Sequence, residues 1–135
     1  DSLEFSFSGI KTAVVNLVRH LGWNPAAENL PSQQVADLAA SFQEAVVDVL
    51  VHKTFKAVHG QRVKHLAVVG GVAANGRLRQ RLLEEAAYRR IELYLPPLRF
   101  CTDNAAMIAA AGYWVWRRSG FLLRPWDLDA LSRWP

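Results

Sequence analysis

The chain has 135 residues, of which 51% are hydrophobic, and this favours a single globular domain with its own core. Its formal charge is +4, and Arg supplies twelve of the sixteen basic residues, which is compatible with a phosphate-bearing partner without requiring one. No apolar run reaches bilayer-spanning length, and the single cysteine, Cys101, excludes an internal disulfide framework and a multi-cysteine zinc site. We therefore expect a cytoplasmic protein without membrane contact.

The first predicted elements are a strand and a helix. Leu3, Phe5 and Phe7 alternate with polar residues, which is the period of a half-buried strand, and Gly9 indicates a change of direction. Apolar residues at helical spacing then predict a helix over residues 10–21. The N-terminus lacks an initiator Met and the charge pattern of a leader, so we expect a truncated boundary and a missing upstream half.

The strongest helical pattern occupies the middle of the chain. A connection rich in Asn, Pro and Ala over residues 22–31 leads to Ser32, the candidate N-cap of a long helix that ends near Gly60. The residues predicted to form one apolar face of this helix are Val35, Leu38, Phe42, Val46, Val49 and Leu50.

Two strands and two helices complete the prediction. A continuous apolar run over residues 66–69 closes at a diglycine, as in a buried parallel strand, and a helix over 73–88 follows. An alternating strand over 91–95 then leads to a last helix over 102–119, with an irregular tail over 120–135. This order predicts an α/β fold with a largely parallel sheet. The inward positions of the helix after the diglycine are Leu78, Leu82 and Ala86.

Three turns follow the predicted strands, at residues 6–11, 70–75 and 101–104. Because ligands of parallel sheets bind at the carboxyl ends of the strands, these turns are the candidate positions of a site. In the first turn, Ser6 and Ser8 have no partner that would make them nucleophiles, and ordinary turn chemistry explains them at least as well.

The second turn carries the diglycine Gly70-Gly71 and then Asn75. Glycines expose backbone N–H groups at the start of a helix, where a phosphate or a ribose can dock. The Asn75 amide both donates and accepts hydrogen bonds, which suits a ribose hydroxyl or a carbonyl. Alternatively, the glycines only permit a tight turn and Asn75 only caps the helix.

Asp103 and Asn104 lie in the third turn, just before the last helix. A carboxylate at this position either caps free N–H groups, which is the commoner role, or binds a divalent cation at the strand end. Asn104 suits either purpose. Separately, an arginine cluster in the preceding helix region either offers a basic stripe to RNA or forms a solvated helix face, the usual explanation. Its members are Arg77, Arg81, Arg89 and Arg90.

Taken together, three sequence strings favour the ligand-binding interpretations of these turns over the purely structural ones. FSFSGIKTAV (5–14), GGVAANGRLR (70–79) and CTDNAAMIAAAG (101–112) closely resemble, in the same order, the C-terminal half of the TsaD family. These are tRNA N6-adenosine threonylcarbamoyltransferases, once described as O-sialoglycoprotein endopeptidases. The resemblance covers about residues 1–112 and implies an actin-like ATPase fold of the ASKHA, ribonuclease H-like class. Residues 1–119 would form its C-terminal lobe.

The resemblance also implies a reaction and roles for residues. Family members transfer a threonylcarbamoyl group from threonylcarbamoyl-adenylate to N6 of the adenosine beside the anticodon, in tRNAs that read codons starting with A. By motif, Asn75 would contact the adenylate, Gly70 and Gly71 would let it approach, and Asp103 would ligate one divalent metal ion, iron or zinc. The implied partners are tRNA, a paralogous actin-like protein and a small ATPase.

The chain departs from the family by omission. The family's metal site also needs two histidines spaced HxxxH, and this sequence has no such pair, so we expect the chain alone to be inactive. No residue is a convincing general base. The alternatives are a nucleotide- or partner-binding module without catalysis, or a lobe of a sugar or acid kinase of the same fold. An endopeptidase is not supported, because neither a histidine pair nor a catalytic triad can be assembled.

Overall fold

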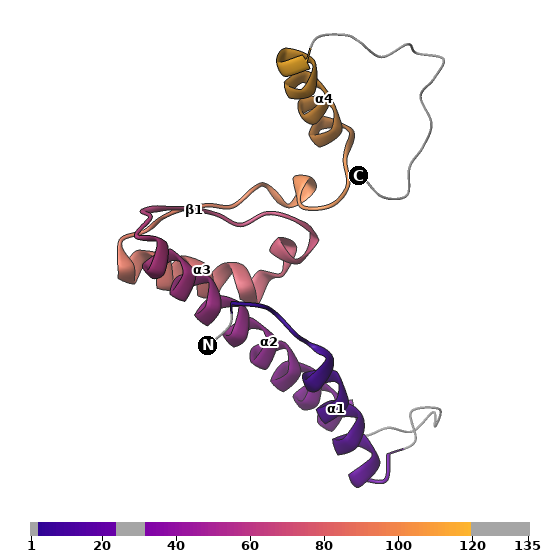
Figure 1. Ribbon diagram of the computed structural model, residues 1–135. Coiled ribbons are helices and arrows are strands. Elements are labelled where there is room, and N and C mark those ends of the chain that lie inside the picture. The colour runs from indigo at the N-terminus through magenta and orange to yellow at the C-terminus, as the bar shows by residue number, and fades with distance from the viewer. Residues whose placement is uncertain (1–2, 24–31, 120–135) are drawn as a thin grey trace, which may run out of the picture. The chain divides into compact units, whose positions relative to one another are not determined.

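The computed structural model describes residues 3–23 and 32–119 (Figure 1). The predicted tail over residues 120–135 and most of the predicted connection before the long helix lie outside the described residues. The chain divides into two compact units, Asp1–Cys101 and Thr102–Pro135. In the described part of the chain, no helix is long and apolar enough to cross a membrane.

The predicted order of helices and strands is confirmed from the first helix onward, with ends shifted by a few residues. Two short 3₁₀ helices, η1 and η2, were not predicted. Ser32 is the first residue of its helix. The elements are α1 (Ser8–His20), α2 (Ser32–Gln61), β1 (His65–Ala67), η1 (Gly71–Ala74), α3 (Gly76–Arg89), β2 (Glu92–Tyr94), η2 (Leu98–Phe100) and α4 (Ala105–Ser119).

The strand predicted at the start of the chain is wrong, because residues 3–7 have no regular secondary structure. Phe5 and Phe7 nevertheless lie on the same side of this segment, because their rings stack with their centroids 6.2 Å apart. The Lys53 ammonium lies over the Phe5 ring, 5.6 Å from its centroid. A strand also needs a neighbouring backbone to bond with, and among the described residues β1 and β2 pair only with each other.

The sheet consists of β1 and β2, which run parallel with Leu66 paired to Leu93. The chain passes from one strand to the other through α3, because parallel neighbours require a long crossover connection. Parallel strands also end at the same edge of their sheet. The turn after β1 and the segment after β2 therefore both begin at this edge.

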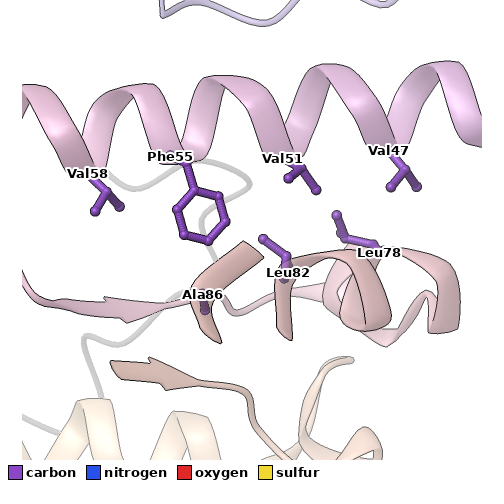
Figure 2. Packing of buried hydrophobic residues seen from close by; sticks show 7 residues of the cluster. All are labelled: Val47, Val51, Phe55, Val58, Leu78, Leu82 and Ala86. Atoms are coloured by element: carbon purple, nitrogen blue, oxygen red, sulfur yellow. The ribbon is translucent and has the colours of Figure 1, made fainter. Parts of the chain in front are cut away.

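The core lies between α2, α3 and the sheet. Figure 2 shows side chains of α2 directed toward those of α3, and Leu66 and Leu93 of the sheet pack against this cluster. Phe55 and Leu82 are its most buried large side chains, each 1% exposed. All three inward positions predicted for α3 are confirmed. The buried cluster is Val47, Val51, Phe55, Val58, Leu78, Leu82 and Ala86.

The predicted core face of α2 is largely wrong. Val35 is 38% exposed, and the buried positions of α2 begin only at Val47. The reason is that α3 packs along the second half of α2, whereas α1 accompanies its first half (Figure 1). Val69, at the end of the apolar run after β1, is 73% exposed, because the ladder ends at Ala67.

Candidate functional site

The two glycines after β1 have different conformations. Gly70 has φ 94° and ψ 173°, a region of backbone space that is essentially restricted to glycine. The tight-turn interpretation is therefore confirmed at Gly70. Gly71 is not among the positive-φ glycines, and a Cβ built there would meet no atom within 4 Å. Among the described residues, neither strain nor crowding explains a glycine at position 71.

Asn75 is the N-cap of α3. Its Oδ1 accepts a hydrogen bond from the Leu78 N–H at 2.9 Å, and its Nδ2 donates to Oε1 of Gln43, on α2, at 3.0 Å. The capping interpretation is thus confirmed. Because an amide offers two donor and two acceptor positions, one of each remains beyond these two contacts. Capping and ligand binding are compatible roles for Asn75, and the two contacts fix the orientation of its amide.

A cavity of about 250 Å³ lies beside Asn75, between α2 and the start of α3. Gln43 and Asn75 are the polar side chains of its lining. A mostly apolar pocket with a few placed polar groups is the usual form of a small-molecule site. The apolar lining residues are Phe42, Val46, Val47, Leu50, Val72 and Leu78.

Arg79 of α3 connects the turn after β1 with the segment after β2. Its Nη1 donates to the carbonyl oxygen of Ala73 at 2.9 Å, and its Nη2 donates to the carbonyl oxygen of Pro96 at 3.0 Å. The buried thiol of Cys101 lies 3.8 Å from Nη1. Sequence reasoning gave Arg79 no role. The available signal was an arginine next to the inward position Leu78, in the first turn of a helix that begins at a candidate site.

In the second unit, the last helix is capped by Asn104 and not by Asp103. Oδ1 of Asn104 accepts a hydrogen bond from the Met107 N–H at 3.0 Å. Asp103 is exposed, and its carboxylate forms no hydrogen bond or ion pair with the other described residues. Asn104 therefore fills the capping role that was the alternative for Asp103.

A metal centre is not complete within residues 3–23 and 32–119. In these ranges, no three His, Cys, Asp or Glu side chains are grouped so that they could hold a metal ion. A bound divalent ion needs several protein ligands, and Asp103 alone supplies one carboxylate. These residues by themselves do not fit the metal that the family resemblance implies.

Most of the arginine cluster is engaged in ion pairs. Arg77 binds both carboxylate oxygens of Glu44, each at 2.7 Å, and Arg81 contacts Glu44 at 2.7 Å and Asp48 at 3.0 Å. The hydrogen bonds from Arg77 hold the pKa of Glu44 below its usual value. Arg89 pairs with Glu85 one turn earlier in α3. Arg77 and Arg81 therefore tie α3 to α2 and do not form a free basic stripe.

The first candidate turn is held by local contacts. The Thr12 hydroxyl donates to the Ser8 carbonyl oxygen at 3.0 Å, and the hydroxyl oxygens of Ser6 and Ser8 lie 3.0 Å apart. These local contacts at the start of α1 agree with ordinary turn chemistry. Because residues 3–7 do not form a strand, this turn does not follow the carboxyl end of one.

A parallel strand, a glycine turn and a capped helix define an α/β protein whose candidate ligand site lies at the carboxyl ends of its strands. The family model for TsaD, tRNA N6-adenosine threonylcarbamoyltransferase, matches residues 2–110. The chain belongs to the TsaD family, which confirms the resemblance seen in its three sequence strings. Membership implies the actin-like, ASKHA fold.

Curated relatives named tRNA N6-adenosine threonylcarbamoyltransferase agree with this assignment. The chain is 59% identical to the protein of Syntrophobacter fumaroxidans, over 98% of the chain and 39% of that relative. It is 57% identical to the Bacillus cereus protein over 83% of the chain and 32% of the relative, and 53% identical to the Symbiobacterium thermophilum protein over 84% and 32%. The chain thus spans between 32% and 39% of the length of these relatives.

Proposed function

We propose that residues 1–119 form the C-terminal lobe of a cytoplasmic tRNA N6-adenosine threonylcarbamoyltransferase and hold the adenylate part of its substrate. The observation that carries this proposal is the turn from Gly70 to Asn75. It joins the carboxyl end of β1 to the N-terminus of α3 and lies beside a mostly apolar cavity. Three features meet there: the pair of glycines, whose backbone no side chain covers, the N-terminus of α3, and the oriented amide of Asn75.

Each feature suits one part of threonylcarbamoyl-adenylate. The N-terminal end of a helix carries partial positive charge and free N–H groups, which favour the phosphate. Open space at Gly71 lets the nucleotide approach the backbone. The remaining donor and acceptor positions of Asn75 suit a ribose hydroxyl, which also donates and accepts.

In the proposed reaction, the N6 amine of the tRNA adenosine attacks the carbamoyl carbon of the bound substrate. A nitrogen–carbon bond forms, the bond from that carbon to the phosphate oxygen breaks, and AMP leaves. This chain contributes by binding and orienting the adenylate, so that the reacting carbon is held for attack. We assign no residue of the chain as the general base that removes the proton from the attacking amine.

Asp103 is proposed to give one carboxylate to a divalent ion, iron or zinc, whose other ligands come from outside this chain. We assign no step of the reaction to the ion, because the described residues do not complete its site. The proposed partners are tRNA, a paralogous actin-like protein and a small ATPase. The chain alone is expected to be inactive.

Substituting Asn75 separates substrate binding from helix capping. Asp is as good an N-cap as Asn, whereas Ala loses about 1 kcal/mol of stability. In a full-length family member carrying this sequence, Asn75→Asp should keep the cap on the Leu78 N–H but lose the donor to Gln43, so its melting temperature should fall less than that of Asn75→Ala. Asn75→Asp should also weaken binding of a nonhydrolysable threonylcarbamoyl-adenylate analogue, because a carboxylate cannot donate and repels phosphate. Asn75→Ala should lose both the cap and the binding. Unchanged affinity of Asn75→Asp in calorimetric titration would limit Asn75 to capping.

A binding module without catalysis is the second candidate, favoured by the incomplete metal set of the described residues. The two functions differ in one outcome. A full-length protein that binds the analogue but transfers no threonylcarbamoyl group to tRNA would support the module, whereas transfer supports the enzyme.

A further inference from the structure

Arg79 differs from its neighbours on α3 in what it binds. Arg77 and Arg81 pair with carboxylates of α2, whereas Arg79 donates to two backbone carbonyl groups that follow different strands. Within the described residues, Arg79 forms no ion pair. Its guanidinium is half-buried at the carboxyl-end edge of the sheet.

The geometry of a guanidinium explains why arginine suits this place. Its donors form a rigid planar fork, so a single side chain reaches two acceptors at a fixed separation. A lysine ammonium is a compact donor on a flexible stem and cannot reproduce that fork. The two segments at this edge are also joined by a backbone hydrogen bond from the Val68 N–H to the Tyr94 carbonyl oxygen. Apart from this bond and the ladder between β1 and β2, no backbone hydrogen bond joins them among the described residues.

We propose that Arg79 is a positioning residue for adenylate binding. By holding the Ala73 and Pro96 carbonyl groups at once, it fixes the turn that carries Gly71 and Asn75 relative to the segment that leads to Cys101. This inference rests on the proposed function, since it names a residue that organises the same site.

Amide hydrogen exchange tests the link without any ligand. Each linked segment contains 3₁₀-type hydrogen bonds whose donors are the N–H groups of Ala73, Asn75, Phe100 and Cys101. In a full-length family member carrying this sequence, Arg79→Ala should speed exchange at both pairs of amides. The control Arg81→Ala removes an arginine of the same helix that faces α2, and it should leave these four amides unchanged. Exchange that is unchanged in Arg79→Ala, or changed in one segment only, would overturn the link.

Titration with the nonhydrolysable adenylate analogue tests the consequence. Arg79→Ala should raise the dissociation constant at least about tenfold, because misplacement of binding groups by about 1 Å is costly, while Arg81→Ala stays near wild type. Arg79→Lys keeps the charge but bonds one carbonyl at a time, so its affinity should be intermediate; it also serves if Arg79→Ala does not fold. Wild-type affinity in both Arg79 variants would overturn the positioning role. If the wild-type protein binds no analogue, the proposed function fails, and the exchange experiment still decides the link.

Discussion

Arg77 and Glu44 form a bidentate ion pair that ties the first turn of α3 to α2. Nε and Nη2 of Arg77 each lie 2.7 Å from a different carboxylate oxygen of Glu44. This fork geometry is among the stronger forms of charge-assisted hydrogen bonding. Because α3 begins at the candidate site, the pair helps to hold that end of the helix against α2.

The pair gives the protein a pH dependence. Hydrogen bonds from Arg77 lower the pKa of Glu44 from its usual value of 4.5, so the folded state binds this proton less readily than the unfolded state does. The stabilisation is present above pH 4.5 and is lost as the pH falls through the lowered pKa. Glu44→Gln should therefore melt at a lower temperature than wild type at neutral pH. Its melting temperature should also fall less than that of wild type on acidification.

Melting curves over a pH series check this sign. Asp37→Asn is the matched control, because Asp37 lies on the same helix and bonds to Gln33 of that helix. The melting temperature of Asp37→Asn should depend on pH as that of wild type does. An acid-induced loss in Glu44→Gln as large as that of wild type would contradict the role of the pair.

Truncating the core should be costly. Phe55→Ala removes a side chain that is 1% exposed at the centre of the contact between α2 and α3, and it should lower the free energy of unfolding by about 3–5 kcal/mol. Val69→Ala, at a site 73% exposed, should change it by less than about 0.5 kcal/mol. Urea denaturation measures both values, and equal losses would show that the core is misassigned.

The two glycines should respond differently to the same substitution. Gly70→Ala forces a side chain into a strained backbone conformation and should cost about 1–3 kcal/mol of stability. Gly71→Ala meets open space, so its stability should stay near wild type, while the added methyl group blocks the adenylate. Paired thermal melts and analogue titrations decide this. A Gly71→Ala variant with wild-type affinity would show that the nucleotide does not approach there.

Substitutions of Asp103 and Asn104 should also have different effects. Asn104→Ala removes the cap of α4 and should cost about 1 kcal/mol, with bound metal retained. Asp103→Ala should lower metal content and transfer in the full-length protein with little effect on its melting temperature. Elemental analysis beside a thermal melt tests the pair. Full metal occupancy in Asp103→Ala would remove its role as a ligand.

The sequence predicted well what depends on local periodicity. The inward face of α3 followed from the spacing of Leu78, Leu82 and Ala86, and the buried cluster contains all three. The apolar pattern of α2 also gave a long helix, but it did not show which part of that helix its neighbours cover. Val35 is exposed for this reason.

Other features depend on partners or on single-residue geometry. The alternation around Phe5 predicted a strand, yet a strand forms only beside another backbone. At the site, adjacent residues with similar chemistry have different roles, which their types alone do not show: Asn104 rather than Asp103 caps its helix, and Gly70 rather than Gly71 has the strained turn conformation. Arg79 was missed because its partners are carbonyl groups, which carry no residue-specific signal in a sequence.

Transfer of the threonylcarbamoyl group to a tRNA that reads codons starting with A tests the central claim most directly. The assay supplies threonylcarbamoyl-adenylate and compares this chain alone with a full-length family member that carries its sequence. We expect modified adenosine from the full-length protein with its partners, and only background from the chain alone. Transfer by the chain alone would contradict the assignment of a single lobe that binds substrate without completing the active site.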